Sequence, residues 1–198
     1  MRRHAGRSRE HELGAPRTDA DASLRIHLSE ARHGRRRMRV RIGYAHVMVA
    51  AALALATFCG VGYVPVAPGT VGSLAGLVLW VVLPHSIQAQ GAVIVVMFGA
   101  GAWASGLAEK HFRATDPAPV VIDEVMGMLI TLFMNPVGWL GAIAALLLFR
   151  VFDVIKPYPA DRLEQLPGGV GVMADDFMAA IYANVALRAM LALGRWIW

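Results

Sequence analysis

Apolar residues dominate the chain from Ile42 onward, and charged residues interrupt them only at a few places. No Asp, Glu, Lys or Arg occurs between Ile42 and Ala108. This stretch is long enough for three apolar helices, which we expect over residues 44–62, 71–83 and 87–108, with proline-containing breaks between them. The third is long enough to span a bilayer, which takes about 20 residues.

The pattern changes after a polar segment that ends at residue 119. Residues 120–134 and 137–156 predict two helices, joined at the helix-breaking pair Asn135-Pro136. Their apolar parts, about 11–13 residues each, would cover roughly 16–20 Å and therefore fall short of a bilayer core. We expect a helical hairpin that enters one leaflet or packs against the other helices. A Pro/Gly-rich loop over residues 157–173 then leads to a final helix over residues 174–197.

Composition supports a membrane protein. Hydrophobic residues make up 57% of the chain and charged residues 17%, whereas soluble domains contain about 25% charged residues. The net charge of +5 comes from residues 1–41, because the rest of the chain carries a small excess of acids. We interpret residues 1–41 as a disordered Arg-rich tail that stays cytoplasmic and touches anionic lipid, not nucleic acid. Residues 42–198 form the second predicted domain, and the predicted fold class is an all-α, membrane-associated helical bundle with short hairpins.

Several charged residues lie unusually close to apolar segments in the second half of the chain. They are five acids and two bases: Asp123, Glu124, Asp153, Asp175, Asp176, Arg150 and Lys156. In the predicted hairpin, Asp123 lies roughly 18 Å before the turn and Arg150 roughly 21 Å after it, so both reach the open end. Arg150 and Asp153 share one helix face. The alternative is that these are ordinary helix-end charges at the water interface, with Arg150 and Asp153 as a structural ion pair.

Carboxylates without a cluster of His or Cys are the ligand set that Mg²⁺ prefers. A base beside such a metal suits a phosphate substrate, so the residues predict metal-assisted phosphoryl chemistry at a membrane surface. The glycine-rich stretch from Pro68 to Ser73 places the hydroxyls of Thr70 and Ser73 at the start of a helix, where backbone N–H groups favour an anion. An ordinary loop and helix cap would have the same sequence.

Four ordered motifs resemble the phosphatidylglycerophosphatase A family over about residues 43–190. They are Ala67-Pro68-Gly69-Thr70-Val71-Gly72-Ser73-Leu74, Asp123-Glu124 with Gly127 and Met128, Phe149-Arg150 with Asp153, Lys156-Pro157 and Pro159, and Gly168-Gly169-Val170-Gly171-Val172-Met173 with Asp175-Asp176. The resemblance implies a Mg²⁺-dependent enzyme that hydrolyses phosphatidylglycerophosphate to phosphatidylglycerol and phosphate. It also implies a multi-pass protein of the bacterial inner membrane, with its site facing the cytoplasm.

Taken with the resemblance, the residues predict a catalytic and metal-binding set and a phosphate-binding set. The first set is Asp123, Glu124, Asp153, Asp175 and Asp176, of which only some can contact the metal, because Mg²⁺ usually takes one or two carboxylates and keeps its waters. Either Asp175 or Asp176 could serve as the general base. The second set is Arg150, Lys156, Thr70 and Ser73.

Three other functions compete with this interpretation. A haloacid-dehalogenase-type site would need the Asp-x-Asp at Asp19 and Asp21 to follow a buried strand, but it lies in the polar tail. A histidine-based lipid phosphatase would need clustered histidines, which this chain lacks. A small transporter or channel subunit would carry its acids at mid-membrane, whereas these are predicted at helix ends on one side.

Overall fold

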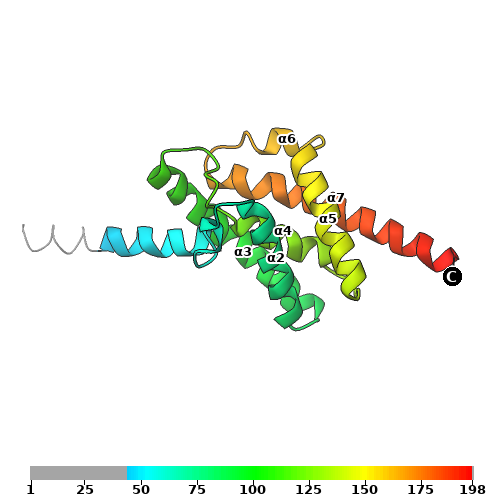
Figure 1. The fold of residues 1–198 in the computed structure, drawn as a ribbon. Coiled ribbons are helices and arrows are strands. Elements are labelled where there is room, and N and C mark those ends of the chain that lie inside the picture. Colours follow the sequence, from blue (N-terminus) through cyan, green and yellow to red (C-terminus); the bar gives the residue numbers. More distant parts are fainter. Residues whose placement is uncertain (1–43, 198) are drawn as a thin grey trace, which may run out of the picture. The chain divides into compact units, whose positions relative to one another are not determined.

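The computed structural model describes residues 44–197, so the predicted tail over residues 1–41 lies outside the described residues. The chain divides after Ala45, and the account below concerns the unit that begins at His46. All regular structure in the described residues is helical (Figure 1), which confirms the predicted all-α class. The elements are a helix Tyr44–Ala56, a short 3-10 helix η1 (Val61–Tyr63), α2 (Pro68–Val82), α3 (Ile87–Phe112), α4 (Ile122–Leu132), α5 (Trp139–Ile155), α6 (Ala160–Leu163) and α7 (Gly169–Ile197).

Several helix boundaries differ from those predicted, by four residues at the end of α3 and by one or two residues at the ends of α4 and α5. Three further differences have a local explanation. The first helix ends at Ala56, because the Thr57 hydroxyl donates to the Leu53 carbonyl at 2.8 Å and accepts from the Gly60 N–H at 3.1 Å. Helix α2 begins at Pro68, since proline is well suited to the first turn of a helix. Helix α7 begins at Gly169, directly after Gly168, whose φ of 66° lies in the left-handed region.

Two helices are long and apolar enough to cross a membrane, namely α3 and residues Gly169–Leu193 of α7. Helix α2 is apolar but shorter. One face of α5 is exposed and apolar along its length, with Leu140 at 66%, Leu147 at 61% and Val154 at 75% exposure. Such a face is unusual against water and is compatible with contact to lipid.

Helix α4 is the centre of the bundle. Every residue from Ile122 to Leu132 is buried except Glu124, and α4 contacts α2, α3, α5 and α7. The sequence predicts a hairpin that either enters one leaflet or packs against the other helices. Helix α4 packs against the other helices. An 11-residue helix can be enclosed in this way only if its neighbours approach closely.

Small residues allow that close approach. A Cβ added at Gly76 of α2 would lie 2.6 Å from the Val125 carbonyl oxygen, and one at Gly127 of α4 would collide with the Phe149 ring. The same holds where α7 meets α3, because a Cβ at Gly101 would lie 2.7 Å from the Met173 sulfur. Glycines thus set the spacing of α2 and α5 against α4 and of α7 against α3, and through α7 they position Asp175 and Asp176.

Side chains of α7 complete the backbone hydrogen bonding at the end of α4. The Asn184 amide nitrogen donates to the carbonyls of Ile130, Thr131 and Phe133 at 3.0, 2.9 and 2.9 Å. Arg188 donates to the same Phe133 carbonyl at 3.1 Å and to the Asn184 side-chain oxygen at 2.9 Å. The last carbonyls of a helix have no partner within it, so these two residues fix α7 against α4.

We expect Gly76→Ala to destabilise the protein and Gly99→Ala, its matched control, to leave stability unchanged or improve it. At Gly76 the new methyl group would push α2 away from α4, at a cost of about 1–3 kcal/mol. At Gly99 of α3 nothing lies within 4 Å, so helix propensity can add up to about 1 kcal/mol. Thermal unfolding in the same detergent measures both, and equal melting temperatures for the two variants would contradict the packing argument.

Candidate active site

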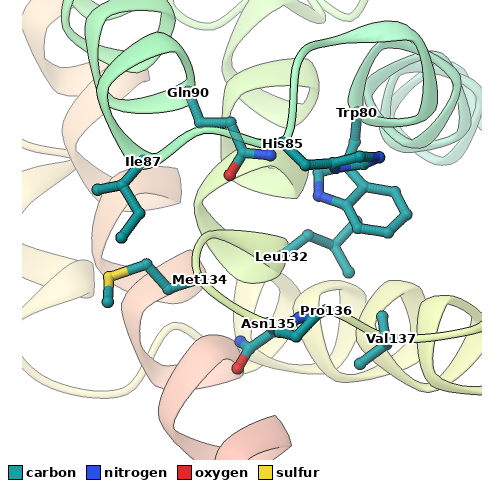
Figure 2. Close-up of a pocket in the computed structure, with 9 residues that line it drawn as sticks. All are labelled: Trp80, His85, Ile87, Gln90, Leu132, Met134, Asn135, Pro136 and Val137. Atoms are coloured by element: carbon teal, nitrogen blue, oxygen red, sulfur yellow. The ribbon is translucent and has the colours of Figure 1, made fainter.

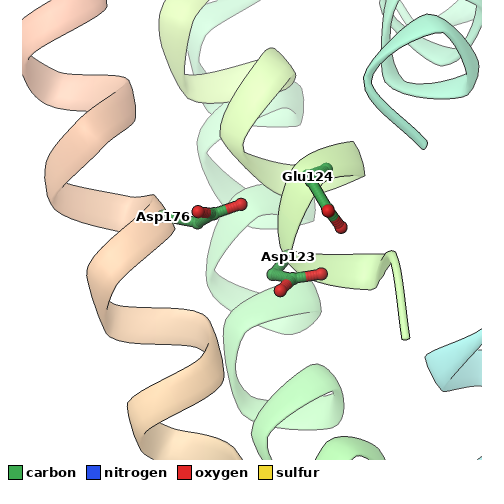
Figure 3. A group of neighbouring side chains, drawn as sticks. All are labelled: Asp123, Glu124 and Asp176. Atoms are coloured by element: carbon green, nitrogen blue, oxygen red, sulfur yellow. The ribbon is translucent and has the colours of Figure 1, made fainter. Parts of the chain in front are cut away.

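Three carboxylates meet where α4 begins beside α7. Asp123 and Glu124 lie in the first turn of α4, and Asp176 extends from α7 towards them (Figure 3). One oxygen of each side chain lies within 4.8 Å of the others. We call these three residues the carboxylate cluster. Acids are favourable at a helix start because of the helix dipole, but here Asp123 and Asp176 are only 6% and 4% exposed.

Several oxygens of the carboxylate cluster are not paired with a hydrogen-bond donor from the described part of the chain. One buried oxygen each of Asp123, Glu124 and Asp176 lacks a hydrogen-bond partner within the described residues. Burial raises the pKa of Asp123 well above its ordinary value, and the neighbouring Glu124 raises it further. Burial also raises the pKa of Glu124. Buried carboxylates this close require protons or a cation, and the oxygen-only donor set fits a hard divalent cation such as Mg²⁺.

Arg150 of α5 lies at the edge of the carboxylate cluster. Its guanidinium Nη1 is 2.6 Å from the Asp153 carboxylate, the ion pair suggested by their spacing, and 3.9 Å from that of Glu124. Arg150 and Asp153 are partly exposed, at 25% and 14% of their side-chain surface. A cation with access to solvent therefore stands next to the buried acids, as the hairpin geometry predicts.

The glycine-rich start of α2 lies against the same residues. A Cβ at Gly69 would collide with the Glu124 carboxylate and lie 3.1 Å from two guanidinium nitrogens of Arg150. Thr70 is half-buried at this helix start, whose N-cap residue provides no side-chain hydrogen bond. Ser73 is completely buried and donates its hydroxyl to the Gly69 carbonyl at 2.9 Å. The glycine-rich start of α2 thus lies against the carboxylate cluster with its backbone.

Lys156 and Asp175 form a separate pair. The Lys156 ammonium is 2.8 Å from Asp175 and 2.9 Å from Glu164. Burial lowers the pKa of Lys156, but its bonds to Asp175 and Glu164 outweigh burial and raise that pKa overall. Sequence reasoning missed Glu164, because it lies just beyond a short helix and only the folding of the chain after α5 returns it to Lys156. Of the predicted set, Asp123, Glu124 and Asp176 are together, Arg150 and Asp153 adjoin them, and Lys156 is bound to Asp175.

Carboxylates beside an arginine and an uncapped helix start are typical of enzymes that act on phosphate esters. Residues 54–191 match the Phosphatidylglycerophosphatase A family. The chain belongs to this family and is therefore a phosphatase, which confirms the resemblance.

Three curated relatives extend this comparison. A Bacteroides thetaiotaomicron protein, provisionally named a phosphatidylinositol-3-phosphatase, is 36% identical over 72% of this chain and 92% of its own length. The phosphatidylglycerophosphatase A proteins of Haemophilus influenzae and Escherichia coli are 38% and 34% identical, over 69% and 64% of this chain and 86% and 76% of their own lengths. No solved structure matches significantly.

We expect Asp176→Asn to raise the melting temperature of the protein in a chelating buffer. The change removes one of three carboxylates, two of them buried, that repel one another within 4.8 Å. Added Mg²⁺ should stabilise the wild type more than the variant, because a ligand that binds only the folded state shifts its stability. Asp161→Asn, at an exposed position of α6, is the control. If Asp176→Asn and Asp161→Asn respond alike with and without Mg²⁺, the carboxylate cluster is not a cation site.

Proposed function

We propose that this protein hydrolyses the terminal phosphomonoester of phosphatidylglycerophosphate, yielding phosphatidylglycerol and inorganic phosphate, with Mg²⁺ as cofactor. The observation that carries the proposal is the carboxylate cluster with Arg150 and the start of α2 beside it. Family membership supports the reaction, and two relatives carry the corresponding name.

In this proposal, the carboxylate cluster holds Mg²⁺ through one or two direct carboxylate contacts. When bound, Mg²⁺ would neutralise charge on the phosphate and lower the pKa of a bound water. Asp153 keeps Arg150 in place through their ion pair at 2.6 Å. Asp175, held by Lys156 at 2.8 Å, orients water or accepts a proton. Each of the five acids in the predicted catalytic and metal-binding set therefore has a proposed role.

The phosphate is proposed to lie beside Arg150 and the first turn of α2. A Cβ at residue 69 would collide with the Glu124 carboxylate and lie 3.1 Å from two guanidinium nitrogens of Arg150, so a glycine there lets both side chains lie against the helix start. Arginine suits bidentate contact with phosphate oxygens, and the half-buried Thr70 contributes its hydroxyl or N–H. Ser73 acts through its hydrogen bond to the Gly69 carbonyl, which holds this turn in place. Lys156 adds positive charge nearby while it positions Asp175.

The reaction in this arrangement needs one proton acceptor and one proton donor. A water oxygen forms a new bond to phosphorus, and the phosphorus–oxygen ester bond breaks. One water proton passes to Asp175 or Asp176, and the departing glycerol oxygen takes up a proton from a solvent water molecule. Arg150 stabilises the charge that develops on the phosphoryl oxygens.

The protein is proposed to lie in the bacterial inner membrane as a multi-pass protein. The two apolar helices α3 and α7 support this location by their length and composition. The arginine-rich residues 1–41 favour a cytoplasmic N-terminus by the positive-inside rule. The site is proposed to face the cytoplasm, where phospholipid head groups of the inner leaflet are accessible.

Phosphate release from defined lipids tests the reaction. We expect the full chain in mixed micelles to prefer phosphatidylglycerophosphate over phosphatidylinositol 3-phosphate, to lose activity with a chelator and to regain it with Mg²⁺. Asp123→Asn, Glu124→Gln and Asp176→Asn should each lower kcat by about 10²–10⁴-fold, since each removes charge at the reacting centre. Asp161→Asn should keep wild-type activity. A preference for phosphatidylinositol 3-phosphate would instead favour the function in the name of the Bacteroides relative.

Variants of Arg150 and Asp153 distinguish a role of Arg150 in phosphate binding from a role in ion pairing alone. We expect Arg150→Ala to lower kcat/KM by about 10²-fold or more in a protein that still folds, because a transition-state contact is lost. Asp153→Asn breaks the same ion pair but leaves the guanidinium in place, and it should have a smaller kinetic effect. Steady-state kinetics and thermal unfolding of both variants measure this. If both variants lose the same stability and Arg150→Ala has no additional kinetic defect, Arg150 serves only in a structural ion pair with Asp153.

A further inference from the structure

A pocket lies at the end of α4 opposite the carboxylate cluster. It has a volume of about 580 Å³ and forms where the end of α2, the first turn of α3 and the α4–α5 connection meet (Figure 2). Asp123 and Leu132 lie at the two ends of α4, so this pocket is roughly 14 Å from the acids at 1.5 Å per residue. Its size is in the usual range for small organic ligands. We call it the hairpin pocket.

The walls of the hairpin pocket are mainly hydrocarbon and aromatic. They include Trp80, whose ring packs edge-on against His85 at 5.2 Å, together with Leu132 and Val137. The residues that line it contain no Asp, Glu, Lys or Arg. The hairpin pocket therefore does not suit a phosphate or a metal ion, and its ligand should be neutral and largely apolar.

The polar side chains on these walls are Gln90, Asn135 and His85, and the Asn135 amide already donates to the Thr131 carbonyl at 3.2 Å. Gln90, in the first turn of α3, is 8% exposed, and Figure 2 shows its amide directed towards His85 on the pocket wall. Its backbone N–H donates to Ser86 at 3.0 Å, but its side-chain amide has no hydrogen bond within residues 44–197. An amide offers two N–H donors and one acceptor oxygen to a ligand in the pocket. The ligand should therefore present one hydrogen-bonding group to Gln90.

A lipid acyl ester has this combination of a long apolar chain and one carbonyl. The hairpin pocket lies at the start of α3, one of the two helices long and apolar enough to cross a membrane. Apolar residues beside it are strongly exposed, with Val82 at 70%, Ile87 at 54% and Trp139 at 72%. We propose that the hairpin pocket binds the acyl-ester part of a membrane lipid, with the chain against Trp80 and Leu132 and the ester carbonyl accepting a hydrogen bond from Gln90. This site is distinct from the phosphatase site and needs no phosphate.

Trp80 provides a direct readout of binding. In detergent micelles, a phospholipid brominated on one acyl chain should quench the fluorescence component that is lost in Trp80→Phe. The ester-linked lipid should bind about fivefold more tightly than its ether-linked analogue, the ratio that one net hydrogen bond supplies. Gln90→Leu should abolish this preference, whereas the same change at Gln88, which is exposed two residues earlier, should keep it. Val137→Phe, which fills the hairpin pocket, should weaken binding of both lipids.

Two probes distinguish the source of the lipid. Equal quenching by brominated phosphatidylcholine and brominated phosphatidylglycerophosphate would identify a neighbouring bilayer lipid as the ligand. Stronger quenching by phosphatidylglycerophosphate, reduced by Asp176→Asn, would identify the chain of the substrate. Both outcomes support the proposal. Quenching that is unchanged in Trp80→Phe, or an ester preference that persists in Gln90→Leu, would overturn it. Because binding is measured directly, the result does not depend on the proposed phosphatase reaction.

Discussion

The burial of α4 on all sides is the constraint on which the rest of the structure depends. A helix of 11 residues is too short to cross a bilayer, yet it contacts four other helices. Its first turn carries Asp123 and Glu124, so the packing that buries its apolar residues also buries Asp123 and most of the Glu124 side chain. The carboxylate cluster therefore results from the way in which the bundle encloses its central helix.

Close helix packing and the chemistry of the site share the same residues. Gly69 and Gly76 are on one helix, where Gly76 allows α2 to pack against α4 and Gly69 allows Glu124 and Arg150 to lie against the helix start. In α7, Asp176 is close to the start of the helix, and Asn184 bonds the last carbonyls of α4 two turns later. Helix α7 thus supplies Asp176 at the N-terminal end of α4, and its Asn184 pairs with the free carbonyls at the C-terminal end. A shift of α7 along its axis would disturb both ends together.

The two ends of α4 present different environments to a lipid. At one end stand buried carboxylates with an arginine that reaches solvent, a setting suited to a phosphate group. At the other end lies the hairpin pocket, which has mainly apolar walls and the amide of Gln90. The exposed apolar face of α5 runs between these two levels. This polarity along one short helix matches the polarity of an amphiphilic substrate.

Sequence alone determined the helical class, the order of the helices and the identity of the charged residues, because hydrophobic runs and proline breaks are local signals. It also placed Arg150 near Asp153 and Glu124, since the length of each hairpin arm sets their height. Only the tertiary structure decided that Asp176 joins Asp123 and Glu124 while Asp175 pairs with Lys156. Adjacent residues on a helix point in different directions, and the rotation of α7 against α4 is set by long-range contacts of small residues. The partnership of Lys156 with Glu164 and the pocket around Gln90 likewise arise from segments that meet only after the chain has folded.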